Sequence, residues 1–148
     1  MSGHRVLRMW IRPATRAPPQ ERDELELVEG EGIVGDHTRG TRRHVTLLFE
    51  DDWRAAEAEL GSQVDPAGRR ANVYLSGGGA LALVGSRLRL GAAELEIHGE
   101  THPCHVMELA APGLRAALEP EGRAGVWGQI MRGGTVHVGD ELTPDEHA

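Results

Sequence analysis

The sequence contains no lysine, and all sixteen of its lysine or arginine positions are arginine. This absence excludes mechanisms that depend on a lysine amine, such as a Schiff base with pyridoxal phosphate or the lysine of a phosphate-binding P-loop. Codon bias in a GC-rich genome produces such a composition without selection on function. The chemical consequence is the same in either case, because every permanently cationic side chain in the protein is a guanidinium group.

Cysteine and aromatic residues are also scarce. Cys104 is the single cysteine, which excludes an internal disulfide and favours a reducing compartment, so we expect a cytoplasmic protein. Aromatic residues make up 3% of the chain against 39% for all hydrophobic residues. The core is therefore expected to consist mainly of Leu, Val, Ile and Ala.

The chain also lacks a basic surplus, an N-terminal signal pattern and any apolar run long enough to span a membrane. Its net charge of −7 argues against a protein that binds nucleic acid through a basic face. A length of 148 residues suits one domain that buries about two-thirds of its unfolded surface. We therefore expect a soluble single domain with no membrane or nucleic-acid partner, while the oligomeric state stays open.

Short segments of alternating apolar residues predict a protein made mainly of strands. In the first segment Leu7, Met9 and Ile11 are expected on the buried side, and in the second Leu25 and Leu27. The predicted strands cover residues 7–11, 24–29, 45–49, 73–75, 87–90, 94–98, 126–131 and 135–138. Two hairpins are predicted, one joining 87–90 to 94–98 and one joining 126–131 to 135–138 through two adjacent glycines.

Helices are expected at two places. The longer is predicted to begin at Asp51 or Asp52, with that carboxylate as its cap, and to end at Gly61. A short helix is predicted over residues 113–119, and a frayed polar tail after Glu141. The expected fold class is therefore mainly β, a barrel of short strands with one or two short helices.

Residues 98–105, HGETHPCH, form the one dense cluster of reactive side chains. Imidazole and thiolate groups are good zinc ligands, but the proline and glycine disfavour a helix that would bring the three histidines together. A second interpretation is a reactive thiolate at Cys104, because His102 and His105 could supply positive charge and a loop after a strand would expose the sulfur. In the third, Cys104 is a small buried apolar residue and the histidines are solvated.

Residues 32–43, GIVGDHTRGTRR, form a segment rich in glycine and arginine. It lacks the strand, glycine spacing and helix start of a P-loop or a dinucleotide-binding motif. It is interpreted either as a surface turn with solvated arginines or as an anion pocket of backbone amides and guanidinium groups, to which Arg69 and Arg70 could add. Asp36 would orient an arginine or only shape the turn. The candidate anion-binding residues are Asp36, His37, Arg39, Arg43 and Arg70.

Several short segments follow one another in a characteristic order. They are GIVGDH (32–37), RHVTLL (43–48), NVYL (72–75), LVGSRLRLG (83–91), Pro103-Cys104, RAGV (123–126) and GTVHVGD (134–140). In order and spacing they resemble a MOSC domain, the module named after the C-terminal part of molybdenum cofactor sulfurases. The similarity covers roughly residues 5–142 as a single domain and leaves residues 143–148 as a polar C-terminal tail.

The resemblance implies a MOSC-type β-barrel-like fold. It matches Cys104 to the family's cysteine, which is thought to carry sulfur as a persulfide or to ligate molybdenum. It implies the molybdenum cofactor as the candidate cofactor, although this chain is too short for the additional N-terminal β region through which larger relatives help to hold it. His37 stands where the family frequently has an arginine, and His102 stands before Pro-Cys where a basic residue is frequent.

The first function that follows is sulfur transfer. Cys104 would accept sulfane sulfur from a donor such as a cysteine desulfurase and pass it to a small anionic substrate or to the molybdenum cofactor. His102 or His105 would tune the thiolate. The residues expected to position the acceptor are Arg43, Arg70 and Asn72.

Two other functions stay open. One is a molybdenum-cofactor oxidoreductase that reduces N-hydroxylated compounds, in which Cys104 is the metal ligand and arginines hold the pterin phosphate. The other is a small-molecule binding module, or an enzyme that forms or breaks a C–S bond, in which Cys104 is only structural. The first two functions are enzymatic, the third is enzymatic only if a C–S bond is formed or broken, and none uses pyridoxal phosphate.

Overall fold

Seven strands close into a barrel in the computed structural model, which describes residues 3–145. The strands follow one another around the barrel in the order β11-β7-β8-β9-β5-β6-β1, and β1 returns to β11 through the pair His4 and Leu142. All neighbours are antiparallel except β5 and β6, which are parallel. The bounds are β1 (His4–Ile11), β5 (Val45–Phe49), β6 (Val73–Leu75), β7 (Arg87–Leu90), β8 (Ala93–Glu100), β9 (Val126–Arg132) and β11 (Glu141–Pro144).

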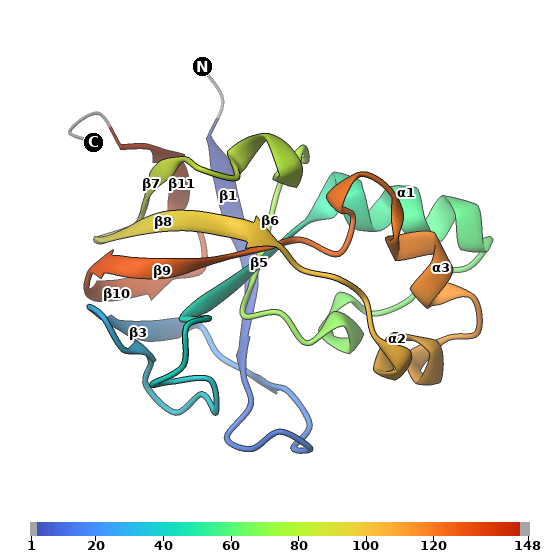
Figure 1. Ribbon diagram of the computed structural model, residues 1–148, viewed down its shortest axis with the longest axis horizontal. Helices are drawn as coiled ribbons and strands as arrows, with labels where there is room; N and C mark the ends of the chain where they lie inside the picture. Colours follow the sequence, from blue (N-terminus) through green and yellow to red (C-terminus); the bar gives the residue numbers. More distant parts are fainter. Residues whose placement is uncertain (1–2, 146–148) are drawn as a thin grey trace.

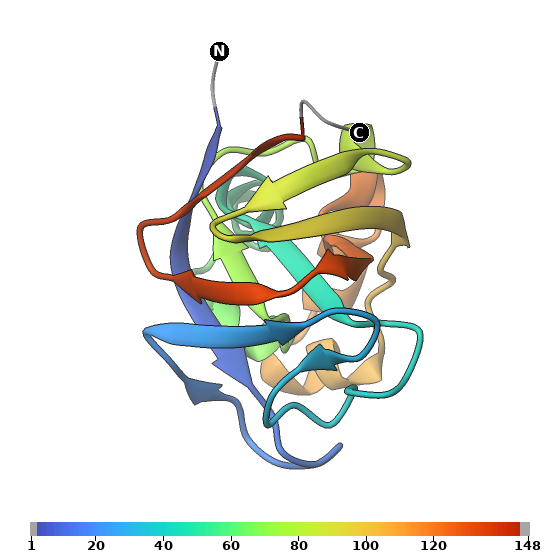
Figure 2. The same ribbon diagram turned by 90° about the vertical axis from the view of Figure 1, so that its left-hand side faces the viewer.

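Three further strands form a small antiparallel sheet beside the barrel, in the order β10-β3-β4 (Figures 1 and 2). They are β3 (Glu24–Val28), β4 (Gly32–Ile33) and β10 (Gly134–His137). The two-residue strand β2 (Gln20–Glu21) pairs with the end of β1. Leu25, Leu27 and Val136 of the small sheet join the cluster of buried side chains inside the barrel, so this sheet covers part of that core.

The helices gather on one side of the barrel (Figure 1). Helix α1 (Glu50–Leu60) lies in the connection between the parallel strands β5 and β6, which is the connection that parallel pairing requires. The helices α2 (His105–Ala110) and α3 (Leu114–Leu118) follow β8, and α3 packs on both α2 and α1. Three 3₁₀ turns complete the description: η1 (Pro66–Arg69), η2 (Ala80–Leu83) and η3 (Pro120–Gly122).

The buried side chains form two clusters on opposite sides of the barrel wall. The cluster inside the barrel consists of Leu, Val, Ile and Ala apart from Met9 and Phe49, as the composition predicts. The cluster between the wall and the helices contains Trp10, Trp53 and Tyr74. The few aromatic residues therefore serve mainly to attach the helices, where large side chains fill the space between flat and cylindrical surfaces.

The predicted strands and both predicted helices are present, with boundaries that differ by a few residues. The predicted burial of the first strand is wrong in one respect. Its register shifts between Val6 and Arg8, so Val6, Met9 and Ile11 face the barrel interior while Leu7 packs against the cluster beneath the helices. A bulge reverses the alternation of side chains, and an alternating sequence pattern does not reveal it.

The predicted hairpin over residues 126–131 and 135–138 is wrong. Strand β9 pairs with β5 and β8, whereas β10 pairs with β3 in the other sheet. Gly133 and Gly134 do not form a tight turn. Because they lack a Cβ, the chain between β9 and β10 can pass close to the backbone of other segments. A Cβ on Gly133 would lie 2.7 Å from the carbonyl oxygen of Leu27, and a Cβ on Gly134 would lie 2.9 Å from Ala92.

The frayed tail predicted after Glu141 is wrong for residues 142–144. Strand β11 pairs with both β1 and β7, and Leu142 is buried inside the barrel. A short polar segment with one leucine carries little periodic signal, so its pairing comes from the closure of the barrel. The last residues of the tail, 146–148, lie outside the described part of the chain.

The predicted carboxylate cap of α1 is also wrong. The N-cap residue is Phe49, without a side-chain cap, while Gly61 ends the helix in the left-handed conformation as predicted. Asp52 accepts hydrogen bonds from the backbone N–H groups of Gly79 and Ala80, each at 3.3 Å. Burial raises the pKa of Asp52, and those two hydrogen bonds oppose the shift. Its carboxylate thus fixes the start of η2 and not its own helix.

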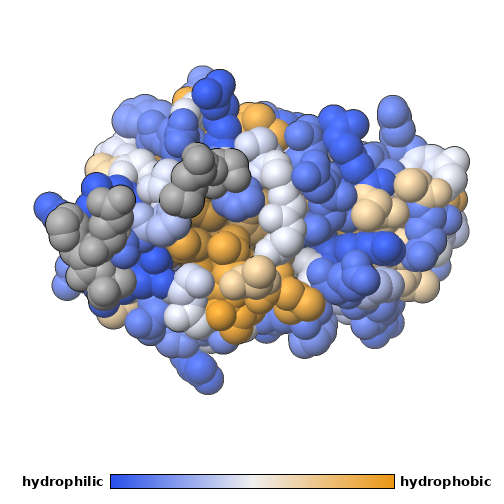
Figure 3. All heavy atoms as spheres, turned by 90° about the horizontal axis from the view of Figure 1, so that it is seen from above, coloured by the Kyte–Doolittle hydropathy of each residue, from blue (hydrophilic) through white to orange (hydrophobic). Residues whose placement is uncertain are grey.

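Hydrophilic side chains cover most of the face seen from above, around one apolar patch near its middle (Figure 3). Within residues 3–145, no helix is both long and apolar enough to cross a membrane.

Candidate active site

A cavity of about 300 Å³ opens against the outer side of β5, where four connections of the chain meet. Thr46 points outward from β5 into this cavity, while its neighbours Val45 and Leu47 face the barrel interior. The connections contribute Arg12 and Thr15 after β1, Asp36 to Thr38 and Arg43 before β5, Arg69 to Asn72 before β6, and Thr101 with Cys104 after β8.

Cys104 lies in the loop between β8 and α2, and its side chain is exposed at the cavity. The loop arrangement agrees with the sequence prediction, since β8 ends at Glu100 and α2 begins only at His105. An exposed sulfur does not fit the interpretation in which Cys104 is a small buried apolar residue.

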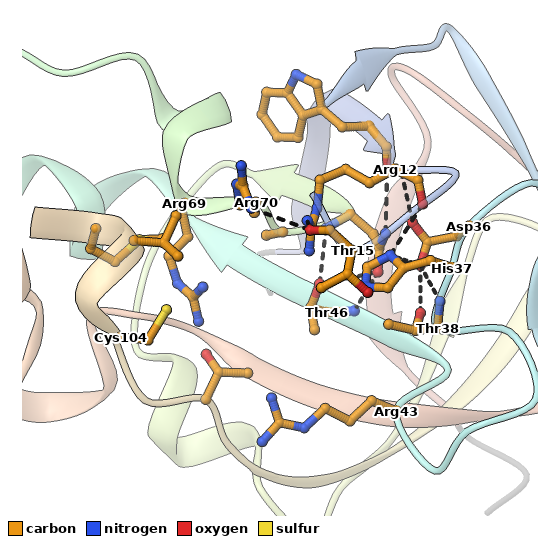
Figure 4. Close-up of a pocket in the computed structure, with 16 residues that line it drawn as sticks. Arg12, Thr15, Asp36, His37, Thr38, Arg43, Thr46, Arg69, Arg70 and Cys104 are labelled. Atoms are coloured by element: carbon orange, nitrogen blue, oxygen red, sulfur yellow. Dashed lines mark hydrogen bonds and ion pairs between the residues drawn. The ribbon is translucent and has the colours of Figure 1, made fainter. Parts of the chain in front are cut away.

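Arg69 lies beside Cys104 at the end of η1 (Figure 4). Its side chain is half-buried, and its accessible part faces the cavity. Its Nε donates to the carbonyl oxygen of Ala124 at 2.7 Å, and among the described residues its two Nη groups have no protein acceptor. The pKa of Arg69 is lowered to about 10: desolvation is the main cause, the charge of Cys104 opposes it, and the positive charges of Arg43 and Arg12 add to the lowering. A half-buried guanidinium with free donors is suited to binding an anion.

Arg12 and Arg70 form the opposite wall of the cavity. Both side chains donate through Nη1 to the carbonyl oxygen of Thr15, in the case of Arg70 at 3.5 Å. Burial lowers the pKa of Arg12, and the positive charge of Arg70 lowers it further. The two cations therefore lie close enough to repel one another, and an anion between them would relieve the repulsion.

Arg43 reaches the cavity from the loop before β5, and its side chain extends toward Cys104 in Figure 4. Its Cζ lies 5.7 Å from the ring centroid of Trp127, which stacks on His98 at 5.3 Å on the barrel exterior. Gly99 leaves the space for this indole, because a Cβ there would lie 2.9 Å from Trp127 Nε1. A cation–π contact thus holds the Arg43 guanidinium without neutralising its charge.

None of these four arginines forms an ion pair with a carboxylate in the described structure. Six arginines elsewhere do pair: Arg8, Arg39, Arg54, Arg87, Arg123 and Arg132. The cavity therefore concentrates unneutralised positive charge around the only cysteine of a protein whose net charge is −7.

Asp36 is the one carboxylate in the cavity wall, and its side chain is almost completely buried. It accepts hydrogen bonds from the backbone N–H of Arg12 at 2.9 Å and from both the N–H and the hydroxyl of Thr38. These contacts fix the position of Arg12, which agrees with the interpretation of Asp36 as an arginine orienter. A carboxylate in this role does not itself contact an anion.

Asn72 also organises the wall. Its Oδ1 accepts from the N–H and the hydroxyl of Thr46, both at 3.0 Å, and its Nδ2 donates to the carbonyl oxygen of Trp10 at 3.3 Å. It therefore ties together β1, β5 and the start of β6, and only one of its amide hydrogens is left for a ligand.

His37 lies in the cavity wall next to Asp36. Its Nδ1 is 3.1 Å from the carbonyl oxygen of Arg12, so Nδ1 carries a hydrogen and donates it. In the neutral ring Nε2 is then an acceptor, and on protonation it becomes a second donor.

Three predicted site residues do not line the cavity. Arg39 pairs with Glu31 at 2.8 Å on the protein surface. His102 and His105 are exposed, and within residues 3–145 neither ring has a hydrogen bond or an ion pair. His98, the fourth member of the sequence cluster, pairs with Glu96 and stacks on Trp127. The cavity wall around Cys104 therefore takes its positive charge from arginines distant in sequence, and tuning of the thiolate by His102 or His105 stays a prediction.

Arg12 is the one charged residue of the cavity wall that the sequence does not identify, and the sequence indicates Arg69 only as an addition to the anion pocket. In the sequence, Arg12 is one more polar residue of an alternating strand, next to a proline-rich segment. In the sequence, the feature that indicates this part of the cavity wall is the Arg69-Arg70 pair just before the NVYL segment. The described residues contain no group of three His, Cys, Asp or Glu side chains arranged to hold a metal ion.

Comparison with protein-family models finds a match over residues 34–143, to the model described as MOSC domain. A search of curated proteins finds no match. Among solved structures, YuaD from Bacillus subtilis has a TM-score of 0.78 at 24% identity, covering 95% of this chain and 94% of its own.

YiiM proteins from two bacteria are similar as well. The protein from Geobacillus stearothermophilus has a TM-score of 0.77 at 13% identity, covering 97% of this chain and 75% of its own. The protein from Escherichia coli has a TM-score of 0.72 at 18% identity, with coverages of 97% and 71%. At these identities the likeness extends to the fold, which is the barrel described above.

Proposed function

Since the chain belongs to the MOSC domain family, whose members act in sulfur transfer or oxidoreduction related to the molybdenum cofactor, we propose that it transfers sulfur through Cys104. The observation that carries the proposal is the exposed thiol among four arginines that have no carboxylate partner. Positive charge favours the thiolate, which is the nucleophilic form of cysteine. The single cysteine suits a reducing compartment, so we propose the cytoplasm as its location.

In the proposed first step, the Cys104 thiolate attacks the outer sulfur of a persulfide on a donor protein of the cysteine desulfurase class. A bond forms between Sγ and that sulfur, the sulfur–sulfur bond of the donor breaks, and the donor leaves as a thiolate with the electron pair. In the second step a nucleophilic atom of an anionic acceptor attacks the outer sulfur, and Cys104 is released as a thiolate. This second step forms a bond between the acceptor atom and the transferred sulfur and breaks the bond between that sulfur and Sγ of Cys104, so neither step needs a further oxidant.

The arginines have distinct roles in this proposal. Arg69, beside Cys104, would stabilise the negative charge of the persulfide, and Arg43 would reach the same region from the opposite loop. Arg12 and Arg70 would bind the phosphate or carboxylate of the acceptor through paired hydrogen bonds. Asp36 would hold Arg12 in place by accepting the hydrogen bond from its backbone N–H, and Asn72 would hold the same strand by donating to the carbonyl oxygen of Trp10.

The experiment is mass spectrometry of the protein after incubation with a cysteine desulfurase and cysteine. We expect the intact mass to rise by one sulfur atom, about 32 Da, and reducing agent to reverse the change. The variant Cys104→Ser should gain nothing. Absence of the adduct on the wild-type protein, with a donor shown to be active on another acceptor, would count against sulfur transfer.

A second candidate is a molybdenum-cofactor oxidoreductase, and the donor set of the cavity favours it. The thiolate of Cys104 is a soft ligand of the kind that suits molybdenum, and the arginines suit the phosphate of the pterin. Bound there, the cofactor would supply the redox chemistry for reducing N-hydroxylated compounds. Metal and pterin analysis of protein purified from a cofactor-producing host tests this function, and protein free of both would contradict it.

A further inference from the structure

A second hollow of about 420 Å³ adjoins the arginine cavity and shares Arg70 and Val106 with it. Most of its remaining wall is apolar, from Pro19, Ala67, Leu109 and Ala110. We call it the apolar groove. It lies between η1 and α2, which pack against one another, and α2 begins immediately after Cys104. The groove therefore starts beside the sulfur that the proposed function uses.

Arg70 forms the ridge between the two hollows. It is one of two described residues other than glycine with positive φ, at 66°, and its N–H donates to the carbonyl oxygen of Ala67 at 3.1 Å. This left-handed conformation is strained for a residue with a Cβ. The long apolar stem of an arginine can cover a hydrophobic neighbour while its guanidinium stays in the polar cavity. A ligand can thus cross from one hollow to the other along this side chain.

Leu109 is the most exposed large apolar side chain in the described structure, at 79%. The other large apolar side chains that are classed as exposed have exposed fractions between 40% and 44%. It belongs to a helix that otherwise turns Met107 into the buried cluster. Leu109 lies in one wall with Pro19, Ala67 and Ala110, so its exposed side chain belongs to a contiguous apolar surface of the kind that marks a ligand-binding groove. Its position points to a neutral, apolar occupant.

The charges around the groove support the same kind of occupant. Its one carboxylate, Asp65, accepts hydrogen bonds from Arg8 and from the N–H of Ala67, both at 2.9 Å. The pKa of Asp65 is lowered, mainly by the hydrogen bond from Ala67, so this carboxylate stays ionised. A second negative group at that end would be repelled. Arg70, at the shared ridge, is the only cation in the wall.

We propose that the substrate of this protein is amphipathic: its anionic group binds among the arginines near Cys104, and an uncharged apolar portion lies in the apolar groove. The proposal depends on the proposed function only for the anion site near Cys104. It adds the chemical class of the sulfur acceptor, which is an amphipathic anion. Leu109 and Ala110 are then residues that determine specificity and take no part in the chemistry.

The test is calorimetric binding of straight-chain alkanesulfonates, from methanesulfonate to hexanesulfonate, to the wild-type protein and its variants. Each methylene placed in the groove should lower Kd about twofold to fourfold, since a fully buried methylene contributes about 0.8 kcal/mol. In Leu109→Gln this dependence on chain length should fall, with methanesulfonate affinity unchanged. In Arg69→Gln the affinity for every member should fall by a similar factor, with the dependence retained.

Two controls keep the result decisive. Leu81→Gln changes another exposed leucine outside both hollows, and it should bind the whole series as the wild type does. Cys104→Ser should keep the dependence on chain length, whatever its effect on the affinity for methanesulfonate, so failure of sulfur transfer and failure of the groove are separate outcomes. A Kd independent of chain length in the wild type would overturn the proposal. So would a change from dimer to monomer in Leu109→Gln on sedimentation, which would make the groove an interface between copies.

Discussion

Arg69 combines the two properties that an anion site needs, fixed position and unused donors. Its Nε is held by Ala124, whose carbonyl oxygen also accepts the hydroxyl of the buried Thr101. The lowered pKa of Arg69 reflects first its desolvation, which the charge of Cys104 opposes, and then the positive charges of Arg43 and Arg12. A bound anion would compensate for both effects.

We expect sulfate to raise the melting temperature of the wild-type protein and to do so much less in Arg69→Gln. A charge-assisted hydrogen bond contributes about 1.5–3 kcal/mol, so the apparent Kd for sulfate should rise at least about tenfold. The matched control is Arg39→Gln, which removes an arginine that pairs with Glu31 outside the cavity. Thermal unfolding over a range of sulfate concentrations, at constant ionic strength, measures both. Equal sulfate dependence in the two variants would contradict this role of Arg69.

His44 predicts how stability depends on pH. Its buried ring accepts a hydrogen bond from the N–H of Ile130 through Nδ1, at 2.9 Å, and burial, followed by the charge of His98, lowers its pKa. The fold favours the neutral ring, so the stability linked to His44 is complete above the unfolded pKa of about 6.5 and is lost as the pH falls below it.

In His44→Asn, the amide oxygen can accept the same hydrogen bond and does not titrate. Urea unfolding between pH 7 and pH 5 should therefore show a smaller loss of stability in this variant than in the wild type. His105→Asn, at an exposed position, should follow the wild-type curve. If the curve of His44→Asn also coincided with the wild-type curve, the buried neutral ring would not be the cause.

The position of strand β9 requires a glycine at the residue immediately before the strand. Gly125 has φ of 100°, and a Cβ there would lie 2.2 Å from the carbonyl oxygen of Leu47. Its own carbonyl oxygen accepts the N–H of Thr101, next to the cavity. This residue brings β9 against β5 and supports the loop that carries Cys104.

We expect Gly125→Ala to lower the free energy of unfolding by about 3 kcal/mol, because steric overlap adds to the strain of positive φ. Gly139→Ala is the matched control, since Gly139 has φ of 95° but nothing within 4 Å of an added Cβ. Strain alone should cost it about 1 kcal/mol. Urea unfolding of both variants measures the difference, and equal losses would show that close approach to Leu47 is not the limiting contact.

The elements differ in how far the sequence predicted them. Hydrophobic alternation identified β3, β5 and the β7–β8 hairpin because their pairing partners are local or their apolar sides are regular. The pairing of β9, β10 and β11 depends on contacts far along the chain, and glycines that signal a turn also permit a close crossing. Cys104 and the arginine pair before β6 are recognisable in the sequence, whereas Arg12 is placed in the site by contacts with Thr15 and Asp36 that an alternating strand pattern does not reveal.

The whole barrel depends on β11, which joins β1 to β7 and closes the ring. Closure leaves these strands without open edges, and it fixes the four connections around the cavity relative to one another. The molecule carries a net charge of −7, yet it holds four unpaired arginines at one place. This contrast steers anions to the cavity and away from the remaining surface.

Leu142→Ala should cost about 2–5 kcal/mol of unfolding free energy, as expected for a leucine removed from a core. A residue of a frayed tail would cost almost nothing. The control Val138→Ala, at a side chain that is 44% exposed, should change stability by less than about 0.5 kcal/mol. Chemical denaturation of the two variants gives the comparison, and a negligible effect of Leu142→Ala would mean that β11 does not close the barrel in solution.

The central claim is that the Cys104 thiolate shares its cavity with arginines free to bind anions. It is tested most directly by the ratio of the rates at which iodoacetate and iodoacetamide alkylate this single cysteine. Iodoacetamide ordinarily reacts faster, because the carboxylate of iodoacetate is repelled by a thiolate. We predict the reverse order here, by about tenfold, with the preference abolished by sulfate and by Arg69→Gln. The ordinary order in the wild-type protein, unaffected by sulfate, would contradict the claim.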